Sequence, residues 1–254
     1  ILKQMSDVPG ITVLDVDSGP DTNRTVVTIV GSPEAVGEAA FQGIKRASEV
    51  LDMSQHSGTH PRMGATDVCP FIPVSDVTIQ ECVELSKQVG QRVGDELRTP
   101  VYLYEKSAQK DNRVKLPDIR KGEYEGFAEK LTDPNWEPDF GPAKLHMKAG
   151  ATVMGCREFL IAYNINLNTK DHRLATDIAF ELREAGRSKR TPNPNSKNLL
   201  DGEIVRNEDG SPVKVPGMFK DVKGIGWYVD IYNRAQISIN FNNFKVSTIH
   251  DVFD

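Results

Sequence analysis

Apolar and polar residues alternate along the first part of the chain in patterns that predict two strands followed by a helix. Residues 11–17 and 25–30 are rich in β-branched side chains and flank a Gly-Pro-Asp turn at 19–21, which is typical of an outgoing and a returning strand. Ser32 and Pro33 then begin a helix. Its apolar positions recur at helical spacing, at Val36, Ala40, Ile44, Ala47 and Leu51. That face is expected to pack on the strands.

A second helix follows with a strong N-terminal signal. Thr78 and Glu81 form a capping-box pattern, in which each side chain reaches a free backbone N–H of the first helical turn. The helix continues with an apolar stripe at Cys82, Leu85, Val89, Val93 and Leu97. Strands are predicted before and after it, at 67–74 and 100–104. These elements indicate an α+β lobe in which helices cover one face of a sheet.

Periodicity fails between residues 111 and 150, where prolines and glycines interrupt the chain. Because long ordered loops are commonly functional or serve as linkers, we expect this segment to cross to a second lobe, with residues 141–150 joining the two. The second lobe is predicted to begin with a strand at 157–166 and to continue with a helix that ends at Gly186. Segment 192–218 is rich in Asn, Pro, Gly and charged residues and is predicted to be a mobile excursion without an assigned role.

The end of the chain repeats a pattern from its beginning. Residues 235–241 alternate between apolar and polar side chains, which predicts a half-exposed strand, and a further helix is expected after it. Asn233 and Arg234 precede this strand as Asn23 and Arg24 precede the earlier one. This echo indicates two related lobes. If their sheets face each other, the crevice between them is the natural ligand site.

Composition narrows the class of protein. With 254 residues and 38% hydrophobic content, the chain can bury one large core or two smaller ones. A net charge of −5 argues against a dedicated nucleic-acid or membrane-surface protein, since both normally carry a basic excess. The three cysteines share no close spacing, which favours buried thiols in a reducing compartment, and so the cytoplasm. No apolar run approaches the length of a membrane span.

Residues 56–69 concentrate the candidate chemistry, because two histidines, an arginine, an aspartate and a cysteine fall within them. His56 and His60 have the spacing of two metal ligands on one helix face, but Gly58 and Pro61 would break a helix there. A loop that gathers this segment around zinc and a plain turn with a structural histidine both stay open. We favour His60 as an acid/base group, since a neutral imidazole on a tight turn exchanges protons near neutral pH while a neighbouring arginine holds an anion.

Several long motifs resemble one known family. The segments that carry the resemblance are 15–25 (DVDSGPDTNRT), 60–74 (HPRMGATDVCPFIPV), 101–104 (VYLY), 122–125 (GEYE), 138–142 (PDFGP), 159–167 (FLIAYNINL) and 224–228 (GIGWY). In this order they closely resemble glutamate formimidoyltransferase, which in animals forms the transferase domain of formimidoyltransferase-cyclodeaminase. The resemblance covers nearly the whole chain apart from segment 192–218.

The resemblance implies a fold and an activity. It implies an α+β sandwich of two related subdomains, 1–159 and 160–254, each a mixed sheet with helices on one face, whose sheets face a central tunnel. It implies transfer of a formimino group from N-formimino-L-glutamate to the co-substrate tetrahydrofolate in histidine degradation, by a homodimer that needs no metal, nucleic acid or membrane. Family members also have an N-terminal strand with a Val-Pro-Asn-Phe-Ser-Glu-Gly run and continue beyond the position of Asp254, so we expect both ends to be incomplete.

The resemblance also carries over site residues. His60, in the His-Pro-Arg-Met-Gly motif, matches the family's catalytic acid/base. The family's folate-contacting loop matches Gly141, Pro142, Ala143, Lys144, Leu145, His146, Met147, Lys148, Ala149 and Gly150. Three of these residues are basic side chains, and the lysines are predicted to attract the anionic folate tail, with solvated loop charges as the alternative.

Three further residues are assigned from the chemistry that this transfer needs. We expect Asp17 to orient or charge-stabilise His60, with a water-facing carboxylate or a turn cap as the alternative. Arg24 and Arg62 are expected to bind glutamate carboxylates or the folate tail, with surface ion pairing as the alternative. Other functions stay open at this point: a folate-binding protein without turnover, a zinc hydrolase, and a transferase that uses a formyl donor.

Overall fold

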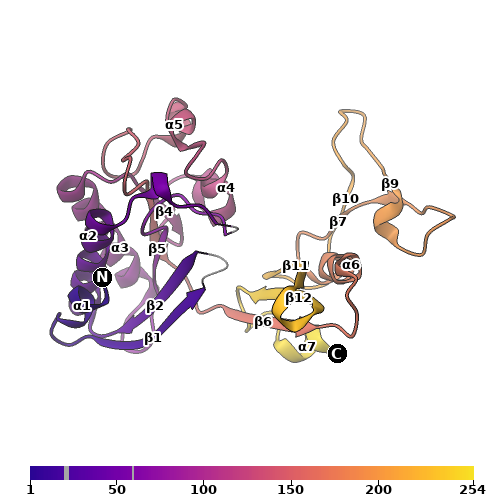
Figure 1. The fold of residues 1–254 in the computed structure, drawn as a ribbon, viewed down its shortest axis with the longest axis horizontal. Coiled ribbons are helices and arrows are strands. Elements are labelled where there is room, and N and C mark those ends of the chain that lie inside the picture. The colour runs from indigo at the N-terminus through magenta and orange to yellow at the C-terminus, as the bar shows by residue number, and fades with distance from the viewer. Residues whose placement is uncertain (20–22, 59) are drawn as a thin grey trace. The chain divides into compact units, whose positions relative to one another are not determined.

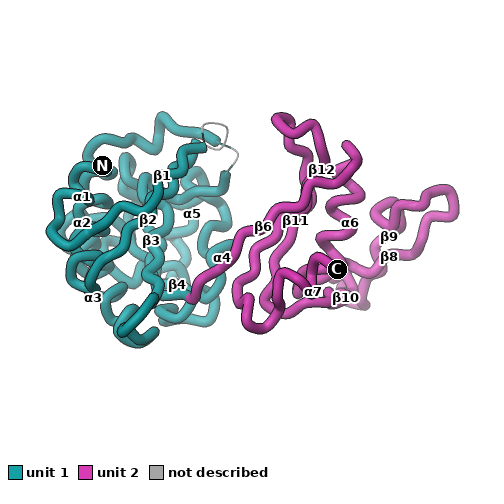
Figure 2. Tube along the Cα trace, turned by 90° about the horizontal axis from the view of Figure 1, so that it is seen from below, with its two compact units in different colours: residues 1–157 teal, residues 158–254 magenta. Residues whose placement is uncertain are grey.

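The computed structural model describes residues 1–19, 23–58 and 60–254. The chain divides into two compact units, residues 1–157 and 158–254 (Figure 2). The α+β class expected from the sequence is confirmed, since both units combine helices with small sheets (Figure 1). Within the described ranges, none of the helices combines the length and apolar character needed to span a bilayer.

Unit 1 contains the elements predicted for the first lobe. Its helices are α1 Leu2–Ser6, α2 Pro33–Val50, α3 Ile79–Leu97, α4 Leu116–Arg120 and α5 Phe127–Lys130. Its strands are β1 Thr12–Gly19, β2 Arg24–Val30, β3 Val68–Phe71, β4 Val101–Glu105 and β5 Thr152–Cys156. Three short 3₁₀ turns complete it, at η1 Met53–Gln55, η2 Asp111–Arg113 and η3 Pro134–Trp136.

Local signals in the sequence place the first helices and the hairpin correctly. The hydroxyl of Ser32 accepts a hydrogen bond from the backbone of Ala35, and the capping box of Thr78 and Glu81 is present at α3. Strands β1 and β2 pair in antiparallel fashion as expected. The predicted turn at 19–21 falls mainly on residues 20–21, which lie outside the described residues.

The centre of unit 1 is a three-stranded parallel sheet in the order β3-β5-β4. Alternate residues of β4 enter two different cores. Val101 and Leu103 pack with α2 and α3 on one face, whereas Tyr102 and Tyr104 pack with Ile119 and other residues of the segment after β4 on the opposite face. The sheet is therefore covered on both faces, as parallel sheets normally are.

The placement of residues 141–150 differs from the sequence prediction. They were expected to join the two lobes, but they lie inside unit 1 and lead into β5, the central strand of its sheet. The sequence pattern missed β5 because all five of its residues are buried and so show no alternation. The second unit accordingly begins at Glu158, and its first strand begins at Ile161 rather than at residue 157.

Unit 2 is built on a three-stranded antiparallel sheet in the order β11-β12-β6, against which α6 packs. Its helices are α6 His172–Leu182 and α7 Ile249–Phe253. Its strands are β6 Ile161–Asn166, β7 Arg187–Ser188, β8 Arg190–Thr191, β9 Glu203–Ile204, β10 Lys214–Val215, β11 Val222–Val229 and β12 Arg234–Phe241, with 3₁₀ turns η4 Leu199–Asp201 and η5 Asp230–Tyr232.

Helix α6 packs closely on the sheet through small residues. Leu174 is 45% exposed, whereas Ala175 and Ala179 are fully buried. The close approach requires glycine in β11, because a Cβ on Gly226 would lie 2.0 Å from the backbone nitrogen of Thr176. The helix ends at Leu182, earlier than the predicted Gly186.

The internal echo seen in the sequence has a structural counterpart. Asn23 and Asn233 both adopt left-handed backbone conformations, with φ of 49° and 50°, directly before the returning strand of an antiparallel hairpin. Asparagine is among the few residues that tolerate this conformation. The repeated Asn-Arg pair therefore marks the same turn-to-strand junction in each unit.

Segment 192–218 leaves the body of unit 2 through two short antiparallel ladders. β7 pairs with β10, and β8 pairs with β9, so the backbone is paired at the base of the excursion. Figure 1 shows the outer part of the segment standing away from the three-stranded sheet of the same unit. Helix α6 and the base of the excursion line a common cavity.

Candidate active site

The loop that contains His60 is anchored to the core of unit 1 by the residues that follow it. Met63 is buried at 1% exposure and packs among the aromatic residues beneath the sheet. Its backbone N–H donates to the Asp67 carboxylate at 2.8 Å, and its carbonyl accepts from Ala151 at 3.1 Å. Asp67 is held in turn by an ion pair with Arg120. The loop therefore has a fixed base.

His60 is held as a neutral imidazole by an arginine. Its Nε2 lies 2.9 Å from Nη1 of Arg24, which begins β2. Since a guanidinium can only donate, Nε2 is the acceptor, and the ring proton lies on Nδ1. Burial lowers the pKa of His60, and the positive charges of Arg24 and Arg120 lower it further, against a backbone hydrogen bond with Pro61 and the charge of Asp67. The imidazole is thus neutral near neutral pH, and Nε2 is the atom that can accept a proton.

Asp17 was expected to orient His60, but Arg24 is the partner that the structure places there. Asp17 is exposed on β1, where it pairs in register with Val26. The described part of the chain records no hydrogen bond between Asp17 and His60. Asp17 and Arg24 do lie on the two strands of one hairpin, so the role of Asp17 stays a prediction.

Arg62 is engaged by carboxylates of its own unit. Its guanidinium donates to Glu125 at 2.6 and 2.9 Å, to Glu123 at 3.2 Å, and to the carbonyl of His56 at 2.9 Å. The hydrogen bond with Glu125 is the largest cause that raises the pKa of Arg62, and the hydrogen bond with Glu123 raises it further. An incoming substrate anion would have to displace these acceptors, so the geometry gives Arg62 a role in holding the loop.

His56 connects the same loop to the β1–β2 hairpin. Its Nδ1 lies 3.3 Å from the side-chain amide of Asn23, and that amide also donates to the carbonyl of Ser57 at 2.8 Å. Asn23 is thus used twice, once in the left-handed turn and once in this contact. The arrangement suits a positioning role for His56, and the acid/base role of His60 stays a prediction.

Residues 141–150 lie directly against the His60 loop, as two glycines allow. Gly64 and Gly150 form an isolated bridge, and the N–H of Ala65 donates to the carbonyl of Ala149 at 2.9 Å. The hydroxyl of Tyr124 donates to the carbonyl of Met147 at 2.6 Å. The structure therefore brings together two segments that the sequence analysis assigned to the same site.

Within residues 141–150, some side chains hold the loop and others are free to meet a ligand. His146 accepts a hydrogen bond from the N–H of Ala149 at 3.0 Å, and Leu145 packs against the aromatic core. Ala149 and Gly150 are buried, and Gly141 and Pro142 are half-buried. The exposed side chains are Ala143, Lys144, Met147 and Lys148. Four of the ten predicted residues thus present exposed side chains, and the folate contacts themselves stay a prediction.

The zinc site considered from the sequence would need several ligand side chains to converge among the described residues. Among them, no cluster of three or more His, Cys, Asp or Glu side chains has the geometry to hold an ion. The thiol of Cys69, considered from the sequence as a zinc ligand, has its pKa raised to about 12 by desolvation. Burial therefore favours the protonated thiol, and the expectation of no metal stays a prediction.

Comparison with known proteins gives the same answer as the motifs. The family model for the N-terminal subdomain of the formiminotransferase domain matches residues 1–157, and the model for the formiminotransferase domain matches residues 162–254. The chain belongs to the formiminotransferase family. The resemblance noted in the sequence is confirmed.

Curated relatives of this formiminotransferase chain fall into two groups by length. The chain is 48% identical to formimidoyltransferase-cyclodeaminase of Mus musculus over 255 residues, covering 100% of the chain and 42% of that protein. It is 41% identical to glutamate formimidoyltransferase of Streptococcus pyogenes over 247 residues, covering 97% of the chain and 73% of that protein. The chain thus spans less than half of the cyclodeaminase-type relatives it matches.

Proposed function

We propose that the chain is the transferase part of a glutamate formimidoyltransferase. The reaction moves the formimino group of N-formimino-L-glutamate to N5 of tetrahydrofolate and releases L-glutamate. The relatives' names and the two family models support this activity. The observation that carries it is the neutral imidazole of His60, bonded to the Arg24 guanidinium beside the predicted folate loop. In this proposal 1–159 and 160–254 are the two subdomains of a cytoplasmic homodimer.

The chemistry needs one proton carrier that acts twice. Attack of folate N5 on the amidine-like carbon forms a C–N bond and a tetrahedral adduct, from which a base takes the proton of the attacking nitrogen. The same group, now protonated, gives that proton to the glutamate nitrogen as the old C–N bond breaks. Nε2 of His60 fills this role once its lone pair is free, and general acid/base catalysis of this kind contributes roughly 10²–10⁴-fold.

Arg24 supplies the means of freeing that lone pair. A substrate carboxylate is a stronger acceptor for a guanidinium than a neutral imidazole, because the resulting hydrogen bond is charge-assisted. Binding of the glutamate moiety is therefore expected to draw Nη1 of Arg24 away from Nε2 of His60. Substrate binding and activation of the base then share one side chain.

The proposed activity is tested with the purified chain, tetrahydrofolate and N-formimino-L-glutamate, by following L-glutamate release and the folate product by mass. We expect stoichiometric formation of both products. N-formyl-L-glutamate serves as the comparison donor and separates formimino from formyl transfer. Folate binding without glutamate release from either donor would contradict the proposal and favour a binding protein.

The charge of Arg24 predicts a shift in the pH profile. In the wild type the pKa of His60 is lowered, so kcat/KM should fall only at acidic pH, below the ordinary histidine range. Arg24→Gln removes one cause of the lowering, so the acidic limb of log(kcat/KM) against pH should move to higher pH, beside any loss of substrate affinity. Arg24→Lys keeps the charge and should leave the limb near its wild-type position. If the acidic limb lies at the same pH in the wild type and in Arg24→Gln, Arg24 does not lower the pKa of His60.

The two exposed lysines of the folate loop predict an effect on binding. Lys144→Ala with Lys148→Ala should raise KM for tetrahydrofolate, more for polyglutamylated forms, with little change in kcat, because ground-state and transition-state binding are lost equally. The defect should shrink as salt rises, since charges separated by more than roughly 8–10 Å are screened near physiological ionic strength. Lys121→Ala is the control for a surface lysine outside the loop. Wild-type affinity of the double variant at low salt would identify these lysines as solvated charges.

A further inference from the structure

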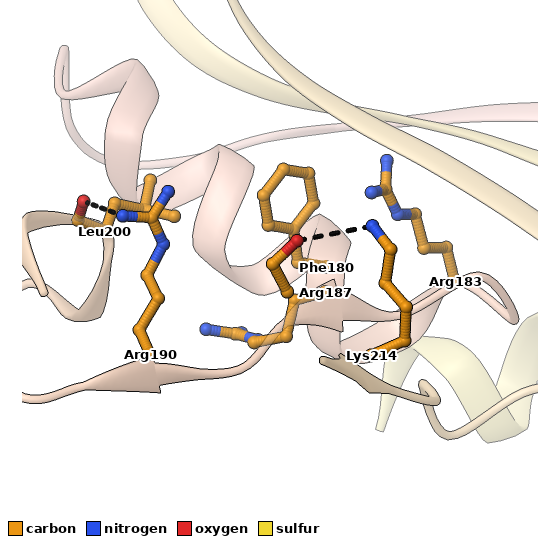
Figure 3. A pocket seen from close by; sticks show the side chains of 7 residues that line it. Phe180, Arg183, Arg187, Arg190, Leu200 and Lys214 are labelled. Atoms are coloured by element: carbon orange, nitrogen blue, oxygen red, sulfur yellow. Dashed lines mark hydrogen bonds between the residues drawn. The ribbon is translucent and has the colours of Figure 1, made fainter. Parts of the chain in front are cut away.

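A cavity in unit 2 collects four cationic side chains outside the proposed catalytic site. It has a volume of about 230 Å³ and lies where α6 meets the base of segment 192–218 (Figure 3). Its lining residues are Phe180, Arg183, Arg187, Ser188, Arg190, Leu200 and Lys214. Arginine and lysine supply the charge of this lining, and among the described residues no acidic side chain belongs to it.

The deepest cation of the cavity is only partly satisfied. Arg187 is buried at 6% exposure and pairs with Asp177 at 2.6 Å and with Glu181 at 2.7 Å, both on α6. Its Nε, also buried, has no hydrogen-bond partner within the described residues. A buried donor without a partner costs free energy comparable to a lost hydrogen bond, so a bound acceptor at this position would be favoured.

The other three cations bond only to neutral acceptors. Arg183 donates to the carbonyl of Gly186 at 2.9 Å and lies over the ring of Phe180, 4.1 Å from its centroid. Arg190 donates to the carbonyls of Leu200 and Gly202, and Nζ of Lys214 donates to the Ser188 hydroxyl at 3.2 Å. Over the described ranges, none of these three forms an ion pair with a carboxylate.

Arg187 already has two carboxylate partners, so the uncompensated positive charge of the cavity comes from Arg183, Arg190 and Lys214. Burial lowers the pKa of the Arg183 guanidinium, and the neighbouring charge of Arg187 lowers it further. Like charges held in a partly buried space repel one another, and an anion among them would turn that repulsion into charge-assisted hydrogen bonds. The cavity is therefore arranged for an anionic ligand.

Size and direction narrow the class of that ligand. A volume of about 230 Å³ is below the roughly 300–1,000 Å³ of pockets for drug-sized ligands, so a whole folate does not fit. Donors approach from Arg183 just after α6, from the β7–β8 stretch and from β10. A phosphate group offers three strong acceptor oxygens and about two charges, whereas a carboxylate offers one charge in one plane. We propose that this cavity binds a compact phosphate-type oxyanion.

Binding would also connect segments that are distant in the sequence. Arg183 follows the end of α6, Arg190 lies in β8, and Lys214 lies in β10 on the far side of segment 192–218. An oxyanion that touches all three would close the base of the excursion onto the helix. Amide hydrogen exchange in residues 187–215 should therefore slow when the ligand is bound.

Titration calorimetry of the full chain with inorganic phosphate and with pyrophosphate tests this inference. We expect one site per chain, with tighter binding of pyrophosphate because it carries more charge. Lys214→Gln should weaken binding by about tenfold or more, because it removes a charge-assisted hydrogen bond to the bound phosphate. In the structure the Lys214 ammonium donates to the Ser188 hydroxyl, a neutral group. Lys189→Gln is the matched control, because it removes the same charge from the same stretch at an exposed position outside the lining.

Several outcomes would overturn the inference. They are no binding of either phosphate, equal loss with Lys189→Gln and Lys214→Gln, or binding of citrate in preference to both phosphates, which would indicate a carboxylate site. Arg190→Lys is a second variant, which keeps the charge but removes the planar guanidinium with its paired N–H donors. It should lose part of the affinity. At a phosphate concentration near the wild-type Kd, the protection of residues 187–215 should be clearly weaker in Lys214→Gln than in the wild type. Formimino transfer is assayed in parallel, because the cavity and the proposed activity can fail separately.

Discussion

Replacement of His60 by alanine is expected to lower kcat for formimino transfer by about 100-fold or more, because it removes the proton carrier for both halves of the reaction. The affinity for tetrahydrofolate should change little, since the exposed side chains of the folate loop remain in place. Steady-state kinetics with both substrates, together with equilibrium folate binding, separates the two quantities. A variant that retained most of its turnover would remove His60 from the acid/base role.

His56→Ala is the matched control for this prediction. His56 lies in the same loop region, and its ring contacts Asn23, which fits a positioning role. Its replacement should cost less activity than that of His60, through loosening of the loop against the hairpin. The reverse order of effects would reassign the acid/base role to His56. Circular dichroism of both variants is needed to show that each is folded.

The elements that the sequence predicted correctly are those fixed by local chemistry. The capping box of Thr78 and Glu81 and the serine cap at Ser32 each act within one helical turn, so they can be recognised in a few residues. Strand β5 was missed because it is buried throughout, and a strand buried on both faces carries no alternation. Strand β11 contains Gly224 and Gly226, and these weaken the strand signal although close packing of α6 requires Gly226.

The candidate site was predictable in its parts but not in its contacts. His60 was chosen from its residue type and its turn, and residues 141–150 were assigned from the resemblance to the family, so both roles stay predictions. The bond between Arg24 and His60 joins residues 36 positions apart, and that contact depends on how the hairpin lies against the loop. Arg120, which bears on the pKa of His60, comes from a one-turn helix in a segment without periodicity. Tertiary contacts of this kind leave no local pattern.

The second large effect is expected at the contact between the two loops of the site. A Cβ on Gly150 would lie 2.1 Å from the carbonyl oxygen of Met63 and 2.7 Å from the Cα of Gly64. Both neighbours are backbone, so one of the loops must move. Gly150 also has a φ of 68°, which disfavours alanine independently. We expect Gly150→Ala to lower the free energy of unfolding by about 2 kcal/mol or more.

Gly150→Ala should also lose kcat under conditions in which the variant is still folded. The folate loop and the His60 loop touch through this glycine, and a displacement of about 1 Å between catalytic groups can cost roughly 100-fold in rate. Gly10→Ala is the control, because Gly10 has a φ of 85° but its added Cβ would meet only the Ala35 Cβ, at an ordinary 3.7 Å. Backbone strain alone should therefore lower the free energy of unfolding of Gly10→Ala by about 1 kcal/mol. Its kcat should be near normal at a temperature where the variant is folded. Equal losses of activity in the two variants would mean that strain, and not the close approach of the loops, makes glycine necessary at position 150.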